Sequence, residues 1–464
     1  MSEENRDVKK LKGFEFWEKT LQKAKLVVAP MVDQSELAWR MLSRKYGAQL
    51  CYTPMLHSSV FIRDPQYRLD GLASCDEDRP LIVQFCGNKP ETILEACLLA
   101  QDKCDAVDLN LGCPQMIAKR GNYGAFLGEK WELVEKIVKT CNEKLSVPIT
   151  CKIRVFTDIE KTVAYAKMLE RAGCQLLTVH GRTKEMKGPK TGIASWKHIK
   201  AVKDAVKIPV YANGNIQYKE DVDRCIKDLK VEGVMTAEGN LHNPAIFMGQ
   251  QPITWEISSE YLDLVEKYPC PMSYVRGHLF KICHHGLQKH TNARDVLAGS
   301  KDLKDMRRSL DILRETCKKV CWGENGVTEG LPHPHWICQP YVRPPPKPDP
   351  SRVKVTPPTS PDIGEVSRKK MKKLLKRCRN ASELSLENLN PNEKAAKLAE
   401  CIAQRQANKP VYTKCVRCGN PSGKNCIFIS CKRCCKDRAR ELEKFCQTHR
   451  NFTPQANCKD NVNS

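Results

Sequence analysis

The stretch VDLNLGCP, residues 107–114, combines a short apolar run with a polar tail that ends in a cysteine and a proline. This run is one of eight apolar runs, which lie at residues 26–31, 49–55, 81–86, 107–111, 149–155, 176–180, 208–212 and 233–237. Segments of helical periodicity lie between most of them, such as residues 91–101, 130–142, 159–171, 196–206 and 219–229. Strands buried on both faces form continuous apolar runs, so this α/β pattern predicts a closed (β/α)8 TIM barrel over residues 20–250. A doubly wound open sheet is the alternative, because periodicity does not distinguish the two.

Several of these runs end in tails rich in polar residues and glycine. The tails are Asn110–Pro114, Lys152–Arg154, His180–Arg182 and Asn213–Asn215. In a barrel they all emerge at the carboxyl-terminal rim, where barrel enzymes build their active sites. Glycine and asparagine after the seventh strand suit a backbone that closely approaches a phosphate group. The sequence therefore predicts one active site at this rim.

The chain has 464 residues, a formal charge of +23 and 25 cysteines. This length exceeds what one hydrophobic core usually fills and predicts two or three domains. No apolar run approaches the length of a membrane helix, and the first residues lack the apolar core of a signal peptide. We therefore expect the protein in the cytoplasm, the nucleus or both, where cysteines are free thiols, metal ligands or catalytic groups rather than disulfides.

Beyond the barrel the sequence predicts four further segments. They are a helical domain (255–325), a proline-rich linker (338–365), a basic helical segment (366–410) and a Cys-rich module (411–450). From Glu365 to Arg450 there are 22 Lys and Arg against 8 Asp and Glu, an excess that favours a nucleic acid partner over a membrane. In the helical domain, the adjacent residues 283–285 are interpreted as a core cysteine beside surface histidines rather than as metal ligands.

The Cys-rich module contains two CxxC pairs and further donors. Its eight potential zinc ligands are Cys415, Cys418, Cys426, Cys431, Cys434, Cys435, Cys446 and His449. Structural zinc takes four cysteine or histidine ligands in a tetrahedron, and a CxxC turn delivers two thiolates to one ion. Eight donors are enough for two ions, but the sequence does not say which ligands share an ion. The Lys and Arg between these cysteines favour contact with nucleic acid phosphates.

Six motifs of the predicted barrel, taken in order, resemble those of the tRNA-dihydrouridine synthase family. They are Ala29–Met31, Gln84–Gly87, Asn110–Pro114, Lys152–Arg154, His180–Arg182 and Asn213–Asn215. The resemblance covers most of residues 20–250. The string Gly112–Gln115, followed by Arg120–Leu127, is most similar to the eukaryotic subfamily that modifies positions sixteen and seventeen of the tRNA D-loop. The resemblance implies an oxidoreductase that reduces the C5–C6 double bond of uracil in tRNA.

The resemblance also implies FMN at the rim, reduced by NADPH or NADH. The predicted tRNA-binding role of the helical domain is based on its basic residues Arg276, Lys281, Lys318 and Lys319, and a solvated surface is the equal alternative. The FMN contacts that the resemblance assigns are Pro30, Met31, Val32, Gln84, Lys152, His180, Asn213, Gly214, Asn215, Ala237 and Glu238. Glu238 stands where the family usually has an arginine, and a carboxylate repels phosphate, so only the backbone there is expected to serve. Asn110, Arg154 and Arg182 are expected to contact the substrate.

Cys113 corresponds to the proton donor of the family. The C5–C6 bond of uracil is electron-poor because C4 carries a carbonyl, so C6 accepts hydride from N5 of reduced flavin. The negative charge then spreads over C5 and O4, and C5 requires a proton. A cysteine thiol is mostly protonated at neutral pH and can act as this acid. Lys152 would stabilise the reduced, anionic flavin. The alternative interpretation of Cys113 is a buried structural thiol.

Two other functions are consistent with parts of this pattern. A flavin barrel oxidoreductase of a small pyrimidine would share the fold, the phosphate site and the substrate ring, but it would need neither the basic segment nor the zinc module. A nucleic-acid-binding protein with an inactive barrel would not need Cys113 and Lys152.

Overall fold

A computed structural model describes residues 10–188, 191–321, 330–342, 390, 393–394, 396–400, 413–423, 425–442 and 444–449. The chain divides into two units, Met1–Pro348 and Asp349–Ser464, and each is described by itself. Within the described residues, no helix combines the length and the apolar character that a membrane span requires.

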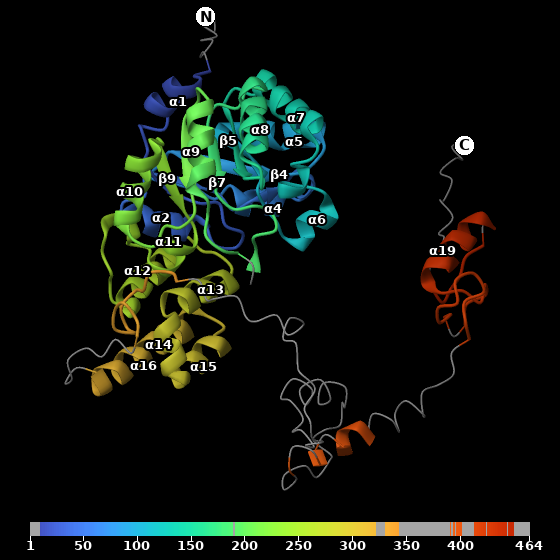
Figure 1. Cartoon of the computed structure of the whole chain (residues 1–464). Helices are drawn as coiled ribbons and strands as arrows, with labels where there is room; N and C mark the ends of the chain where they lie inside the picture. The colour runs from blue at the N-terminus through green and yellow to red at the C-terminus, as the bar shows by residue number, and fades with distance from the viewer. Residues whose placement is uncertain are drawn as a thin grey trace, which may run out of the picture. The chain divides into compact units, whose positions relative to one another are not determined.

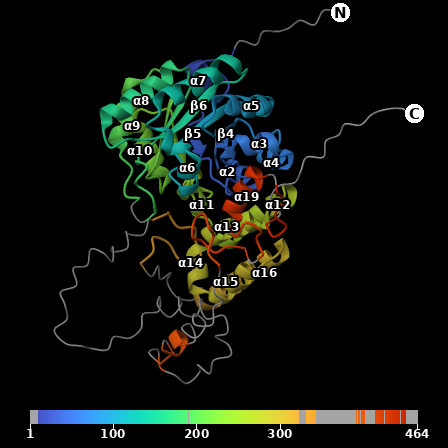
Figure 2. The same ribbon diagram turned by 90° about the vertical axis from the view of Figure 1, so that its right-hand side faces the viewer.

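The first unit contains a closed barrel of parallel strands with helices around it (Figures 1 and 2). The strands are β1 (Leu26–Val28), β2 (Leu50–Tyr52), β3 (Leu56–His57), β4 (Leu81–Cys86), β5 (Ala106–Leu111), β6 (Ile149–Arg154), β7 (Leu177–His180), β8 (Val210–Asn213) and β9 (Gly233–Thr236). Their order is β2-β1-β9-β8-β7-β6-β5-β4-β3, and pairing of β2 with β4 closes the sheet. The predicted barrel is thus confirmed, and the open sheet was the wrong alternative.

The second predicted run, residues 49–55, contains the strand β2 alone, and the short strand β3 follows directly after the run. Both β2 and β3 pair with β4, through Cys51 opposite Leu81 and Leu56 opposite Phe85. Thr53 still donates its N–H to the carbonyl of Ile82 at 3.0 Å. Pro54 follows, and because proline has no N–H the ladder is interrupted there. The short strand β3 was not predicted.

Most helices of the barrel cover the outside of the sheet (Figure 2), whereas the first one lies at its amino-terminal end. The helices of the barrel are α1 (Gly13–Lys19), α2 (Leu37–Lys45), α3 (Ser58–Arg63), α4 (Pro65–Gly71), α5 (Pro90–Ala100), α6 (Met116–Gly121), α7 (Trp131–Lys144), α8 (Ile159–Arg171), α9 (Trp196–Ala205), α10 (Lys219–Leu229) and α11 (Glu238–His242). The five predicted helical stretches correspond to α5, α7, α8, α9 and α10, and α8 and α10 have the predicted bounds.

Alternate side chains of each strand point into the barrel or out toward the helices. Tyr52, Ile82 and Tyr211 fill the interior together with Phe16 of α1. Neighbouring positions such as Val83 pack beneath the helices in a separate core. Helix α1 lies at the amino-terminal end, where the N–H of Gly13 donates to Oε1 of Gln175 just before β7 at 2.9 Å. The opposite rim is left for the polar tails.

Five helices follow the barrel, as the sequence predicts for residues 255–325. They are α12 (Thr254–Lys267), α13 (Met272–Ile282), α14 (His284–Lys289), α15 (Thr291–Gly299) and α16 (Leu303–Cys321). Glu36, which precedes α2, joins them to the barrel. Its carboxylate accepts hydrogen bonds from the Tyr261 hydroxyl at 2.6 Å and from Nε2 of His278 at 3.0 Å. The division of the chain into the predicted domains stays a prediction.

Residues 330–342, here called the returning segment, run back from the helices to the barrel. The N–H of Thr254 donates to the carbonyl of Trp336 at 2.9 Å. Farther along, Nε2 of Gln217, which follows β8, donates to the carbonyl of Tyr341 at 2.7 Å. Cys338 and Gln339, at the start of the predicted linker, are buried in this packing. Residues 343–365 of that linker lie outside the described residues.

The second unit contains a small cysteine-rich fold over residues 413–449, here called the finger. Its one described helix is α19 (Lys432–Glu441), and a bridge joins Lys414 to Pro421. Buried Cys426, Cys435 and Cys446 make up its small core. The predicted basic segment, residues 366–410, lies mostly outside the described residues.

Candidate functional site

A chain of hydrogen bonds runs inside the barrel beneath the carboxyl-terminal rim. Asp108 of β5 accepts from Oγ1 of Thr150 at 2.7 Å and from Nε2 of Gln84 at 2.8 Å. Gln84 then accepts from Nδ2 of Asn110 at 2.7 Å. Burial raises the pKa of Asp108 to about 6, while its hydrogen-bond partners oppose that rise. The sequence analysis missed Asp108, although a carboxylate two residues before Asn110 in an apolar strand was the available signal.

The backbone around Cys113 is fixed from two sides. Oδ1 of Asn110 accepts from the N–H groups of Gly112 and Cys113 at 3.1 and 2.9 Å. On the other side, the N–H of Ala125 donates to the carbonyl of Cys113 at 3.1 Å. Gly124 has φ +62°, and a Cβ there would lie 2.8 Å from that carbonyl oxygen. Cys113 itself is half-buried, so its position is set while its thiol keeps some exposure.

Lys152 of β6 provides positive charge at the rim. The side chain is half-buried, and Nζ donates to Oδ1 of Asn213 at 3.2 Å. Asn213 is oriented in turn by a bond from its Nδ2 to the carbonyl of Met235 at 2.8 Å. Burial, assisted by the charge of Arg154, lowers the pKa of Lys152 to about 8. Lys152 is therefore mostly protonated at neutral pH, but it titrates within a range that is easy to test.

Arg154 ties two rim loops together. Its Nε donates to the carbonyl of Gly112 at 2.8 Å, next to Cys113. Its Nη1 donates to the carbonyls of Thr183 and Met186, in the loop after β7, at 2.9 and 3.3 Å. Arg154 thereby positions the Cys113 loop, and a direct contact with substrate stays a prediction.

Arg182 and Asn215 hold the remaining part of the loop after β7. Nη1 of Arg182 lies 3.1 Å from Nε2 of His180, and Nη2 donates to Oδ1 of Asn215 at 3.1 Å. Asn215 has φ +64°, and its amide exchanges two hydrogen bonds with the backbone of Ala194, at 2.8 and 2.7 Å. The ends of β7 and β8 thus form one rigid corner.

A cavity of about 760 Å³ opens beside this corner. The predicted site residues that line it are Arg154, His180, Arg182, Asn213, Gly214, Asn215, Ala237 and Glu238. Pro114 and Gln115, which follow Cys113 directly, line it as well. Cys113, Gln84, Asn110, Lys152 and residues 30–32 are not among its lining residues; they lie on the other strand ends of the same rim.

The returning segment also contributes Tyr341 and Val342 to this cavity. The sequence analysis did not identify them, because they come more than a hundred residues after the strand ends and no local motif marks them. Trp196 and Gln217 were missed for a similar reason, since each follows a rim motif without being part of it.

Glu238, at the start of α11, lines the cavity with a negative charge. Burial lowers the pKa of Lys281 in α13, and the nearby carboxylate of Glu238 opposes that shift. Lys281 of the helical segment thus interacts electrostatically with Glu238, which stands where the family usually has an arginine. The next residue is confined: a Cβ on Gly239 would lie 2.5 Å from the carbonyl oxygen of Ile216.

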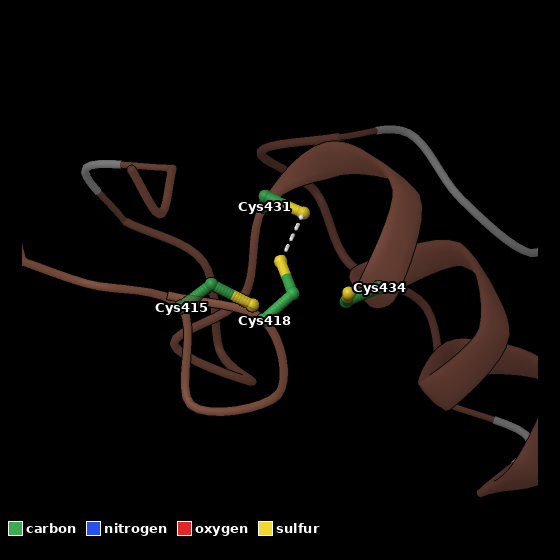
Figure 3. A group of neighbouring side chains, drawn as sticks. All are labelled: Cys415, Cys418, Cys431 and Cys434. Atoms are coloured by element: carbon green, nitrogen blue, oxygen red, sulfur yellow. Dashed lines mark hydrogen bonds between the residues drawn. The ribbon is translucent and has the colours of Figure 1, made fainter. Parts of the chain in front are cut away.

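In the finger, the eight predicted metal ligands lie in two groups of four. One group is Cys415, Cys418, Cys431 and Cys434; the other is Cys426, Cys435, Cys446 and His449. Within each group all ligand atoms lie within 4.8 Å of one another. Figure 3 shows the first group, whose sulfur atoms turn toward a common centre, with the sulfurs of Cys418 and Cys431 3.6 Å apart. The backbone N–H of Cys431 is the main cause that lowers the pKa of Cys415 to about 6, which favours a thiolate.

The two groups alternate along the chain, so the ligand pairing follows no simple sequence order. Both CxxC pairs belong to the first group, and Cys426 of the second group lies between them. The adjacent Cys434 and Cys435 belong to different groups. Two ions bound in this way would brace the finger across its whole length.

The surface of the finger is strongly basic. The described residues 413–423, 425–442 and 444–449 include two acidic residues, Asp437 and Glu441, and eight exposed basic ones, Lys414, Arg417, Lys432, Arg433, Lys436, Arg438, Arg440 and Lys444. Arg417 pairs with Glu441 at 3.3 Å. A positive excess of this size suits a polyanionic partner.

Comparison with known proteins identifies clear relatives. Residues 27–320 match the model of the family described as Dihydrouridine synthase (Dus). A mouse protein named tRNA-dihydrouridine(16/17) synthase (NAD(P)(+))-like is 55% identical, over 95% of this chain and 90% of its own. A Saccharomyces cerevisiae tRNA-dihydrouridine(16/17) synthase (NAD(P)(+)) is 43% identical, over 74% of this chain and 89% of its own. A mouse tRNA-dihydrouridine(20a/20b) synthase (NAD(P)+)-like protein is 35% identical, over 54% of this chain and 78% of its own.

Proposed function

Because this chain belongs to the dihydrouridine synthase family, we propose that it reduces uracil to dihydrouridine at positions sixteen and seventeen of tRNA, with NAD(P)H as the reductant. The observation that carries this proposal is the fixed Cys113 loop on the same barrel rim as Lys152 and the cavity. A protein that only binds RNA needs neither the buried polar chain beneath Cys113 nor a charged lysine beside it.

FMN is the proposed cofactor, and the cavity suits it. Its volume lies within the range of about 300–1,000 Å³ that is common for ligand sites. Gly214, which lines the cavity, has φ +118°, and a Cβ there would lie 2.6 Å from Cβ of Ala194, so the position requires glycine. His180, Asn213, Gly214 and Asn215 would hold the ribityl-phosphate end, where neutral donors and bare backbone suit a phosphate.

The polar edge of the flavin ring would meet Gln84 and Lys152, and its face would lie along residues 30–32. Lys281 supplies positive charge on the side where Glu238 is unfavourable to a phosphate. When bound, FMN would supply the hydride that C6 of uracil accepts. NAD(P)H would supply the hydride that restores the reduced flavin.

Cys113 is proposed as the acid of this reaction. Its S–H bond breaks as the proton moves to C5 of the uracil, and the thiolate is protonated again from solvent. Asn110 and the N–H of Ala125 hold the backbone of Cys113, so that its side chain starts from a fixed position on the rim. Positioning of this kind matters because proton transfer requires hydrogen-bond distance between donor and acceptor.

The target base has to leave the folded tRNA to reach the rim. Unstacking costs a few kcal/mol. Electrostatic contacts with phosphates offset this cost and make binding depend steeply on salt. The basic residues of the finger are proposed to provide part of these contacts.

The direct test uses the purified full-length protein, an unmodified tRNA transcript and NADPH. We expect a yellow protein and dihydrouridine at positions sixteen and seventeen, read by nucleoside mass spectrometry and site mapping. Free uridine serves as the control substrate. Reduction of free uridine without reduction of tRNA would identify a small-molecule enzyme, and reduction of neither would favour the binding-only interpretation.

The rate of flavin reduction by NADPH, measured without tRNA from the loss of flavin absorbance, should fall as the pH rises through about 8. The reason is that Lys152 loses the positive charge that favours the anionic reduced flavin. Lys152→Met should be slower at neutral pH and should lack this fall. Cys113→Ala should keep it, because the thiol acts only on uracil. A fall that persists in Lys152→Met would show that another group titrates.

Two structural zinc ions are proposed for the finger. Zinc takes four Cys or His ligands, and each of the two groups offers four, with sulfur in the majority. A domain this small has little apolar core, so bound metal would contribute most of its folding free energy.

Cys418→Ser and Cys426→Ser, which remove one ligand from each group, should therefore lower the zinc content and weaken tRNA binding. The plot of log affinity against log salt should become less steep, since fewer phosphate contacts remain. Cys75→Ser, a half-buried thiol in the barrel unit, is the matched control. Flavin reduction should stay unchanged in all three variants. Equal tRNA affinity with and without zinc would reject the finger as an RNA contact.

A further inference from the structure

A second cluster of metal-type donors lies in the first unit, apart from the flavin cavity and the finger. It consists of His290, Cys317 and His335, here called the donor trio, whose ligand atoms all lie within 4.8 Å of one another. Nε2 of His290 and Nε2 of His335 are 2.9 Å apart, and Sγ of Cys317 is 3.7 Å from Nε2 of His335. The three residues are 7%, 1% and 4% exposed.

The donors come from three separate parts of the chain. His290 lies between α14 and α15, Cys317 is on α16, and His335 is in the returning segment. No local spacing brings them together, so their convergence is a product of the fold. Neither flavin chemistry nor RNA binding uses them. From this convergence we propose that the donor trio binds a transition metal ion, with zinc as the first choice.

The distances support a shared ion. With Zn–N of about 2.1 Å and Zn–S of about 2.3 Å, a tetrahedral site has N···N edges of about 3.4 Å and N···S edges of about 3.6 Å. The observed N···S separation of 3.7 Å lies close to its edge, and the N···N separation of 2.9 Å would widen by about half an ångström around an ion. A hydrogen bond between the two imidazole rings is the other explanation of the short N···N contact, and it requires that one of the two nitrogens is protonated and the other is not. An ion accounts for both nitrogens and the sulfur together, since all three offer lone pairs to one point.

The apolar surroundings also suit a metal site. Cys317 belongs to the buried core of the helical segment, which includes Leu287, Leu313 and Cys338. Two imidazoles and a thiol that already contact one another in an apolar core offer a transition metal the nitrogen and sulfur ligands it prefers. With three protein ligands, the fourth position of a tetrahedral ion would be taken by water.

The ion would fasten the returning segment to the helices. That segment continues to Tyr341 and Val342, which line the flavin cavity, and Tyr341 accepts a hydrogen bond from Gln217. Loss of the ion should therefore loosen one wall of the cavity. The donor trio would act on the cofactor by positioning and not through any contact with it.

The test measures zinc per chain by mass spectrometry on the full-length protein. We expect three ions in the wild type, two of them in the finger. Cys418→Ser combined with Cys426→Ser should leave the third ion in place, and adding His335→Gln should remove it. His284→Gln, a neighbouring histidine outside the donor trio, is the matched control and should keep it. A finger double variant that is folded and holds no zinc would overturn the proposal.

X-ray absorption at the zinc edge covers the case in which His335→Gln does not fold. On the finger double variant, the remaining zinc should show at least two nitrogen neighbours for each sulfur neighbour. A sulfur-dominated spectrum would mean that the ion remains in the finger and that the donor trio is metal-free. In folded His335→Gln, FMN should dissociate several-fold faster, whereas His284→Gln should retain it. These readouts do not depend on tRNA reduction, so the donor trio and the proposed activity can fail separately.

Discussion

Cys113→Ala should slow dihydrouridine formation by about 10²- to 10⁴-fold, the usual contribution of a positioned acid. The flavin should remain bound, and its reduction by NADPH should keep its normal rate, because the methyl side chain leaves the cavity and Lys152 unchanged. The backbone of residue 113 would still donate to Asn110 and accept from Ala125, since both bonds involve main-chain atoms. Single-turnover oxidation of reduced flavin by tRNA is the measurement that isolates this step.

Cys75→Ala is the control for this prediction, because Cys75 is also half-buried but lies away from the rim. It should retain full activity. Loss of flavin from Cys113→Ala would contradict the role assigned to the thiol, since it would mean that Cys113 supports the cofactor site. Unchanged turnover would assign the proton to another group, with Tyr123 in the same small cluster as the next candidate.

Gly124→Ala should lower turnover by roughly 10²-fold, the loss that a displacement of about 1 Å can cause in a catalytic group. The added Cβ would lie 2.8 Å from the carbonyl oxygen of Cys113 and 3.0 Å from its Cβ, so the Cys113 loop has to move. The left-handed backbone of Gly124, with φ +62°, adds about 1–2 kcal/mol of strain for alanine. Flavin content should stay normal, because Gly124 does not line the cavity.

Gly299→Ala provides the comparison for this substitution. A Cβ on Gly299 meets no atom within 4 Å, so activity and thermal stability should both be preserved. If Gly124→Ala loses stability and activity in parallel, the effect is a general loss of folding. If it retains its melting temperature and binds FMN but turns over slowly, the displaced Cys113 loop is responsible.

The strands and helices of the barrel were predictable from sequence, because buried parallel strands and amphipathic helices have periods that are local properties of the chain. Helix α8 and helix α10 have their predicted bounds for this reason. The pairing of β2 with β4, which closes the sheet, is a long-range contact that these periods do not contain. The rim motifs were also predictable, since each follows directly after its strand. Hydrophobicity alone did not predict the interruption at Pro54. The interruption depends on a backbone N–H that proline lacks at one position in the ladder of hydrogen bonds.

The sequence did not predict which distant residues meet in the folded chain. The tertiary structure placed Cys434 and Cys435 in different ligand groups, although they are adjacent in sequence, because a helix points neighbouring side chains in different directions. The fold also brings His290, Cys317 and His335 together. In the helical segment, the sequence pattern drew a metal interpretation only for the histidines next to Cys283, where it was rejected. Long-range contacts of this kind depend on how whole elements pack, and no local pattern of residues records that packing.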